Sequence, residues 1–278
     1  MNEVPLHVIE PALAVRQQQL ARRIHQLPPS GSRPLTVSGR VAGWITAKAT
    51  MNVDGLPGVH VDPEAVHVTA APRQRLRLEA VLANIAATLR DKGCLRGWRN
   101  ELLDVFGEGR RLSAIERAAV RPLGLLTKAV HLNAWAPDGR LWIARRSATK
   151  STDPDMWDTL VGGLAGAGED LEISLLRESN EEAGLRPEDM QNRDPLRVIL
   201  RMHRRLPEGY QVEDVLVSDC ILPDSVKPEN QDGEVSEFRL VTMGQAWAMV
   251  EANAFTREAE LVIIDGLRRR LPTGRAAA

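Results

Sequence analysis

Three glutamates crowd one short segment of the chain, RESNEEAGL, where Glu178, Glu181 and Glu182 follow Arg177. Residues three or four apart on an α-helix are neighbours, and like charges at that spacing cost about 0.2–0.5 kcal/mol per pair. At about 100° per residue the three carboxylates fall within an arc of about 100° and point toward one region of space. A cation over them would remove the repulsion, and Mg²⁺ prefers oxygen ligands together with waters and substrate phosphates. The spacing therefore predicts a magnesium site for phosphate chemistry.

The glutamates are predicted to lie on a helix over residues 170–183, which Gly184 ends. Leu176, Ala183 and Ile173 fall on the opposite side of that helix, and we expect this apolar side to be buried. The preceding glycines permit a tight loop close to a ligand; they are Gly162, Gly163, Gly166 and Gly168. The alternative is a solvated acidic face, but the glycine loop and the apolar side favour a ligand site.

A chain of 278 residues favours two domains over one. We predict a small α+β domain over residues 1–121 and an α/β domain over residues 122–278, divided near Pro122. The predicted helices of the first domain cover residues 8–27, 75–93 and 113–121. The predicted strands of the second lie within residues 127–147, 156–164, 196–205, 211–222 and 234–242, and its last helices over 244–252 and 257–270. Strands on both sides of a central helix suggest a mixed sheet between helical layers.

The composition is that of an ordinary globular protein, with 43% apolar and 26% charged residues. The 36 basic residues nearly balance the 37 acidic ones, which argues against nucleic acid as a partner. No stretch approaches the roughly 18 apolar residues of a membrane helix. The first residues also lack the pattern of a secretory signal. We therefore expect a cytoplasmic protein without a membrane partner.

The glycine loop and acidic helix resemble the signature of the Nudix (MutT-like) hydrolases. The matching positions are Gly163, Glu169, Arg177, Glu178, Glu181, Glu182, Gly184 and Leu185. Ser179 departs from the pattern, because the family prefers an aliphatic residue there. The resemblance implies a Nudix α/β/α sandwich with a mixed sheet, here preceded by a smaller α+β domain. It also implies water attack on the diphosphate of a small molecule.

The resemblance assigns roles to the matching residues. Glu178 and Glu182 resemble the principal ligands of Mg²⁺, for which Mn²⁺ can substitute, and Glu181 resembles a further ligand. The carbonyl of Gly163 resembles a backbone ligand, and Arg177 the residue that orients the glutamates. The remaining position, Glu169, resembles a structural anchor of the helix.

Which carboxylate accepts the proton of the attacking water is open, since family members differ in this respect. Glu178 is one choice. The segment QDGEVSEFRLVT supplies two others, Glu234 and Glu237, where many members carry a downstream acidic residue. We take Glu234 as the first choice for the general base.

The segment RRSATKSTDPDMWDTLVGG extends the resemblance to one Nudix subfamily. This subfamily has an N-terminal extension shared with proteins related to thiamine pyrophosphokinase, and its members remove phosphate from thiamine diphosphate and its oxidised forms. Candidate substrate contacts follow from the chemistry of the side chains. Arg145, Arg146 and Lys150 could clamp a diphosphate, Trp157 or Trp135 could stack on a cationic ring, and Asp158 could accept a hydrogen bond from an amino group.

Other functions compete with this one. The chain could be a Nudix hydrolase of nucleoside diphosphate-X compounds, or a non-catalytic Nudix-fold binding module, although an inactive module would have no reason to keep three mutually repelling glutamates. An isopentenyl-diphosphate isomerase-like enzyme is disfavoured, because that chemistry needs Cys and His around the glutamates and none lies between Trp157 and Leu185. For the first domain, the sequence leaves open a wall of the substrate cleft or a homodimer contact.

Overall fold

The computed structural model describes residues 6–150 and 152–271. Its largest element is a seven-stranded sheet in the order β11-β12-β7-β8-β13, with β10 paired to β7 and β9 paired to β8. These strands are β7 (Leu126–Trp135), β8 (Leu141–Arg146), β9 (Trp157–Thr159), β10 (Val161–Leu164), β11 (Arg197–Leu206), β12 (Gly209–Ile221) and β13 (Val235–Val241). Strands β7 and β12 run parallel and the other pairs run antiparallel, so the predicted mixed sheet is confirmed.

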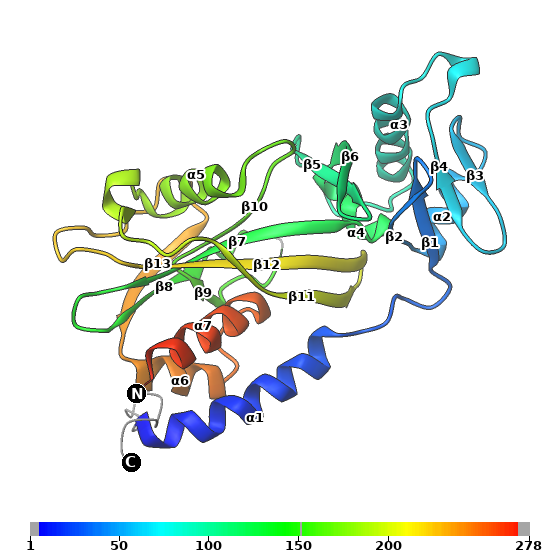
Figure 1. The fold of residues 1–278 in the computed structure, drawn as a ribbon. Coiled ribbons are helices and arrows are strands. Elements are labelled where there is room, and N and C mark those ends of the chain that lie inside the picture. The colour runs from blue at the N-terminus through cyan, green and yellow to red at the C-terminus, as the bar shows by residue number, and fades with distance from the viewer. Residues whose placement is uncertain (1–5, 151, 272–278) are drawn as a thin grey trace.

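Helices cover both faces of this sheet (Figure 1). Helix α5 (Leu171–Ala183) lies on one face, over a core that includes Val130, Leu132 and Leu175. Helices α6 (Met243–Glu251) and α7 (Arg257–Arg270) lie on the other face, where the core includes Trp135 and Trp247. The α/β/α sandwich is therefore confirmed. No helix in the described ranges is long and apolar enough to cross a membrane.

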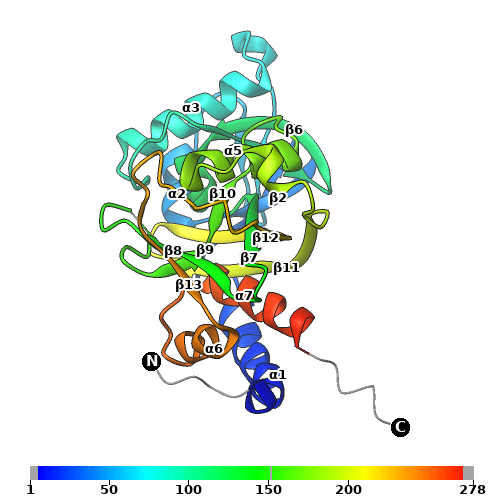
Figure 2. The same cartoon turned by 90° about the vertical axis from the view of Figure 1, so that its left-hand side faces the viewer.

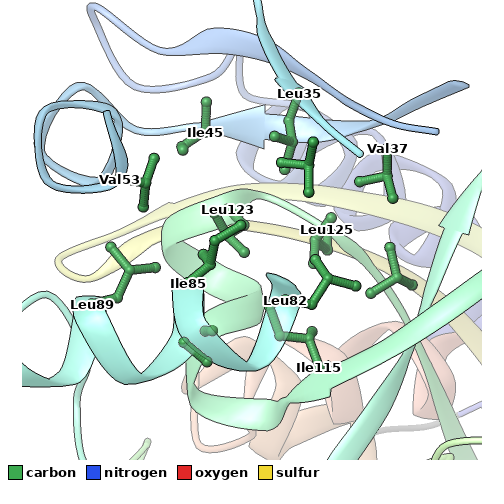
Figure 3. Close-up of a cluster of buried hydrophobic side chains, with 14 of the residues drawn as sticks. Leu35, Val37, Ile45, Val53, Leu82, Ile85, Leu89, Ile115, Leu123 and Leu125 are labelled. Atoms are coloured by element: carbon green, nitrogen blue, oxygen red, sulfur yellow. The ribbon is translucent and has the colours of Figure 1, made fainter. Parts of the chain in front are cut away.

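The region before the sandwich is a smaller α+β unit, as predicted. Its four-stranded sheet has the order β2-β1-β4-β3 and stands beside a separate hairpin, β5–β6. The elements are β1 (Arg33–Val37), β2 (Arg40–Ile45), α2 (Ala47–Val53), β3 (Val59–Val61), β4 (Val66–Val68), α3 (Leu78–Asp91), β5 (Leu102–Gly107) and β6 (Arg110–Glu116). Leu82, Ile85 and Leu89 recur every three or four residues on α3 and point into the core that Figure 3 shows. The hairpin and α3 lie on the same side of the large sheet as α5 (Figure 2).

Two expectations about this region need correction. Residues 113–121 do not form one helix, because β6 continues to Glu116 and only the short helix α4 (Val120–Leu123) follows a single turn of 3-10 helix. The cause is the turn at Glu108 and Gly109, which pairs residues 110–116 with β5 and overrides their helix propensity.

Helix α1 (Leu6–Ile24) also lies elsewhere than expected. It packs against α6, α7 and β11 of the sandwich, and its Leu13 and Leu20 share a core with Leu267. The chain therefore begins on the sandwich, crosses to the small unit and returns. The boundary at residue 121 stays a prediction.

Candidate active site

Helix α5 begins and ends as its sequence predicts. Asp170 caps the start by accepting a hydrogen bond from the Glu172 backbone N–H at 2.9 Å. Gly184 ends the helix at φ 64°, where its N–H donates to Asn180 O and the Leu185 N–H donates to Ser179 O. The bond from the Gly184 N–H to Asn180 O is that of the αL C-cap motif, which needs a left-handed residue at the position of the glycine.

The orientation of α5 differs from the expectation in one respect. Ile173, expected on the buried side, is 58% exposed. The buried side instead includes Glu182, at 6% exposure, together with Leu175 and Ser179. The helix is thus rotated so that Glu178 and Glu182 face β10 and the sheet. The carboxylates are turned inward rather than solvated.

Glu182 is the most deeply buried of the three glutamates. Its Oε2 accepts a hydrogen bond from the Gly162 N–H at 2.9 Å, and its Oε1 lies 3.3 Å from Lys150 Nζ. Burial raises the pKa of this carboxyl from 4.5 to about 7, against the opposing effects of the Lys150 charge and the Gly162 hydrogen bond. The carboxylate is therefore poorly compensated by the protein alone, which favours a further cation beside it.

Glu178 lies directly against the glycine strand β10. A Cβ atom built on Gly163 would lie 2.0 Å from Glu178 Cδ, so only glycine leaves room for this carboxylate. Burial raises the pKa of Glu178, while the Arg177 charge opposes that effect. Two carboxylates with raised pKa values therefore stand at one strand. The Glu181 charge further raises the pKa of Glu178, and the Glu178 charge further raises that of Glu182.

Arg177 joins the acidic residues into one network. Its Nε and Nη2 donate to the two oxygens of Glu169 at 2.8 and 2.9 Å, and its Nη1 donates to Glu178 at 2.8 Å and to Glu181 at 3.0 Å. The hydrogen bonds from Arg177 lower the pKa of Glu169 to about 2. Glu169 also accepts from Gly166 N and Ser174 Oγ, contacts that suit the anchoring role expected of it. The outermost glutamate, Glu181, is half-exposed.

A cleft of about 470 Å³ opens beside this network. Of the predicted residues it is lined by Gly163, Arg177, all three glutamates, Arg146, Lys150, Asp158 and Glu234. Lys150 Nζ forms an ion pair with Glu234 as well as with Glu182, and Arg146 Nη1 donates to Asp158 at 2.9 Å. The structure thus brings the downstream Glu234 to the same cleft as the helix glutamates.

Arg145 and Trp157 do not line this cleft, so the structure does not bring these two predicted substrate contacts to the glutamates. Arg145 follows the strand alternation to the face opposite Arg146, where its Nε donates to Asp155 O at 3.1 Å. Trp157 is 9% exposed in the core between the sheet and α7, with the Arg239 guanidinium 4.4 Å from its ring centroid. Trp135, the other stacking candidate, is fully buried. Among the described residues that line the cleft there is no Trp, Tyr or Phe.

His131 also lines the cleft. Its Nδ1 is 3.1 Å from Thr159 Oγ1, and that hydroxyl donates to Val161 O at 2.8 Å. The network therefore assigns the proton to Nδ1, since the Thr159 hydroxyl can only accept from the ring. Burial lowers the pKa of His131 and keeps the ring neutral. Its Nε2 has no hydrogen-bond partner in the described part of the chain and is an acceptor.

The first unit supplies the rest of the cleft wall. Its contribution comes from residues 96–121 and includes Arg96, Arg99, Glu101, Arg117 and Arg121. This resolves one alternative that the sequence left open, because the unit does form part of the cleft. The spacing of these residues in the sequence does not indicate a site. Only the packing of this region against the glycine loop shows that they line the cleft.

The donor set of the cleft fits a hard divalent cation. Three carboxylates, two of them with raised pKa values, gather at one glycine strand, and oxygen is the preferred ligand of Mg²⁺. Within residues 6–150 and 152–271, however, no three such side chains are already arranged as a closed ligand set. Arg177 and Lys150 hold the carboxylate oxygens instead. A bound cation would have to displace Lys150 from Glu182.

The raised pKa of Glu182 predicts how pH affects the metal-free protein. Its carboxyl has a pKa of 4.5 ordinarily and about 7 in the fold, so the folded state favours the protonated form. This contribution to stability is fully present below pH 4.5 and is lost as pH rises through 7. The loss amounts to about 3 kcal/mol. Denaturant unfolding in a chelator should show it between pH 5 and pH 8 in the wild type but not in Glu182→Gln. Parallel pH profiles for the two proteins would contradict the assignment.

Together, the fold and the site define the class that the glycine loop and acidic helix suggested, an α/β/α protein of the Nudix type. Residues 125–262 match the NUDIX domain family. Residues 14–127 match a domain of unknown function, DUF4743.

The chain is similar to two curated plant proteins. Nudix hydrolase 24, chloroplastic, of Arabidopsis thaliana is 36% identical over 205 residues, which cover 71% of this chain and 55% of the relative. Nudix hydrolase 20, chloroplastic, of the same plant is 34% identical over 205 residues, covering 71% and 54%. The chain thus spans about half the length of these relatives. The crystal structure of DR0079 from Deinococcus radiodurans has a TM-score of 0.45 at 24% identity, covering 62% of this chain and 100% of that chain.

These relatives correct one expectation. Both are named chloroplastic, whereas the sequence led us to expect a cytoplasmic protein. The cytoplasmic expectation is therefore wrong. It rested on the absence of a recognisable secretory signal, which does not distinguish the cytoplasm from other compartments that lack that signal.

Proposed function

We propose that this protein is a metal-dependent Nudix hydrolase that cleaves the diphosphate of a small organic diphosphate to a monophosphate and phosphate. The observation that carries the proposal is the inward-facing pair Glu178 and Glu182, held beside Gly163 at a cleft that also presents Lys150 and Arg146. Buried carboxylates with raised pKa values suit a divalent cation, and the neighbouring basic groups suit phosphate oxygens.

In this proposal Glu178, Glu182, Glu181 and the Gly163 carbonyl would hold Mg²⁺ or Mn²⁺. A bound ion would shield phosphate charge and lower the pKa of an attached water. Arg177 fixes the positions of Glu178 and Glu181 through its two hydrogen bonds. Lys150, once displaced from Glu182, is free to reach a phosphate oxygen. Glu234 remains our choice for the general base, because it stands at the same cleft and pairs with Lys150.

We further propose thiamine diphosphate, or its oxidised forms, as the substrate. The resemblance of the segment at residues 145–163 to the subfamily that shares its extension with thiamine pyrophosphokinase-related proteins suggested this choice. The cleft lends physical support at its far end, where Glu213 and Glu258 accept hydrogen bonds from Gln211 Nε2 at 2.9 and 3.0 Å. With the His131 Nε2 acceptor, these groups present hydrogen-bond acceptors that suit a substrate with an amino group.

A panel of diphosphates tests this function. Purified protein with Mg²⁺ or Mn²⁺ should release phosphate from intact and oxidised thiamine diphosphate with kcat/KM at least about tenfold above that for ADP or ADP-ribose. A chelator should abolish the release. Equal and feeble turnover of every compound would remove thiamine and leave only the Nudix reaction. Turnover of none of them would favour a binding module.

A further inference from the structure

Arginine side chains from the first unit line the cleft beside the glutamates. They are Arg96, Arg99, Arg117 and Arg121. Arg121 donates to the buried Glu213 at 3.1 Å and so belongs to the far end of the cleft. The charge of Arg117 acts on the acidic helix, because it lowers the pKa of Glu178. The domain of unknown function therefore places positive charge where a substrate bound at Glu178 would extend.

Direct hydrogen bonds fix this wall relative to the glycine loop. The Ala167 N–H donates to Leu102 O at 2.9 Å, and the Gly168 N–H donates to Asp104 Oδ1 at 3.0 Å. Both acceptors belong to strand β5, and both donors belong to the loop that leads into α5. The hairpin thus cannot shift without moving the loop that positions the glutamates.

A buried carboxylate holds the arginine-bearing segments together. Glu116 is 4% exposed, and its Oε1 accepts from the Arg99 N–H at 2.8 Å and from the Ala118 N–H at 3.3 Å. The Arg117 N–H donates to Glu101 O at 2.8 Å. These bonds tie residues 99–101 to residues 116–118. These bonds therefore fix the backbone positions from which the arginine side chains extend into the cleft.

Two of these arginines retain capacity for an anion. Arg117 Nη1 donates to Glu101 Oε2 at 2.6 Å, yet 40% of its side chain stays exposed, and a guanidinium has five N–H donors. Arg96 is exposed and has no carboxylate partner within residues 6–150 and 152–271. A planar guanidinium matches the geometry of phosphate oxygens better than an ammonium does.

We propose that Arg96 and Arg117 form a clamp that binds the substrate's diphosphate from the side of the first unit, while the glutamate turn binds it through the metal. The proposal rests on the diphosphate-hydrolase function above. It assigns a role to the first unit: the unit completes the binding site of the NUDIX domain. Hydrolysis by the sandwich alone would then suffer mainly in substrate affinity.

The clamp can be measured without turnover. Binding of magnesium methylene diphosphonate, a diphosphate analogue that is not hydrolysed at the bridge, should be followed by calorimetry on the full chain. Arg117→Gln and Arg96→Gln should each weaken binding at least about tenfold, because each removes a charge-assisted hydrogen bond. Arg117→Lys should fall between them and the wild type. Arg110→Gln, an exposed arginine of the same hairpin outside the cleft, should bind within twofold of the wild type.

Glu101→Gln separates a clamp from a purely structural ion pair. If Arg117 only stabilises the loop through Glu101, this variant should weaken binding and lower Tm as much as Arg117→Gln does, and that result would overturn the proposal. If Arg117 binds phosphate, removing the competing carboxylate should leave analogue binding equal or tighter. In kinetics with the best substrate of the panel, Arg117→Gln should raise KM about tenfold or more and leave kcat within a few-fold.

The clamp and the hydrolase function fail in different ways. Arginine-dependent binding of the analogue without hydrolysis of any diphosphate would sustain the clamp and end the hydrolase proposal. Hydrolysis with Arg96→Gln and Arg117→Gln binding the analogue as the wild type does would sustain the hydrolase and end the clamp. Failure of the wild type to bind the analogue would also end the clamp.

Discussion

Replacing Glu182 with Gln is expected to lower metal-dependent phosphate release by about 10³-fold or more. The metal contributes several kcal/mol of transition-state stabilisation in hydrolysis of this kind, and each 1.36 kcal/mol is a factor of ten in rate. Glu182 supplies one of the two buried carboxylates that would hold the ion. Steady-state phosphate release with saturating Mg²⁺ measures the effect. Full activity in this variant would refute the ligand assignment.

The same substitution should leave the fold intact. Gln has the shape of Glu, and its amide oxygen can keep the hydrogen bond from the Gly162 N–H. The buried negative charge disappears, so metal-free Glu182→Gln at pH 8 should be at least as stable as the wild type. Glu172→Gln is the matched control, because Glu172 lies on the same helix and pairs with Arg193 away from the cleft. Its activity should stay within about twofold of the wild type.

Local patterns made the acidic helix predictable. Gly184 ends α5 at a positive φ, which glycine adopts readily. The spacing of Glu178 and Glu182 placed both carboxylates on one side of the helix. The strands predicted within residues 127–147 likewise correspond to β7 and β8. In each case the determining interactions lie within a few residues along the chain.

The cleft was not predictable in the same way, because its walls come from distant parts of the chain. The sequence around Arg117 does not distinguish it from other arginines. Its place at the cleft follows from the hydrogen bonds by which Leu102 and Asp104 hold the hairpin against the glycine loop. Two candidate contacts, Arg145 and Trp157, lie in the predicted segment, but their side chains lie on the face away from the cleft lining. A single residue of strand register decides that face, and periodicity alone could not fix the register of so short a strand as β9.

The orientation of α5 about its axis was also not predictable from the sequence. The apolar side of the predicted helix suggested that Ile173 would be buried, and the sequence assigned the glutamates to a ligand site without predicting how deeply they lie. Ile173 is in fact 58% exposed, whereas Glu182 is only 6% exposed. The helix thus buries the Glu182 carboxylate at the site and exposes the Ile173 side chain to solvent. Burial against the strand raises the pKa of Glu182. A hydrophobicity pattern does not predict that a charged residue will be buried at a functional site.

Gly163→Ala is expected to reduce hydrolysis by about 100-fold or more, because the new methyl group would occupy the place of the Glu178 carboxylate. The added Cβ would lie 2.0 Å from Glu178 Cδ, far inside van der Waals contact, so the glutamate must leave its position. A misplacement of about 1 Å in a catalytic arrangement can cost about 100-fold in rate. Gly166→Ala is the control, since its Cβ would lie 3.3 Å from the Glu169 carboxylate, and its loss of activity should be much smaller.

A double-mutant cycle in stability tests the cause of that loss. Gly163→Ala alone should lower the free energy of unfolding by about 1–3 kcal/mol through overpacking. In the Glu178→Ala background the clashing carboxylate is absent, so the same methyl group should cost less than about 0.5 kcal/mol. Urea unfolding of the four proteins gives the coupling between the two sites. Equal costs in both backgrounds would mean that Gly163 is needed for another reason, such as its own backbone geometry, and that the close approach of Glu178 to the strand does not explain the glycine.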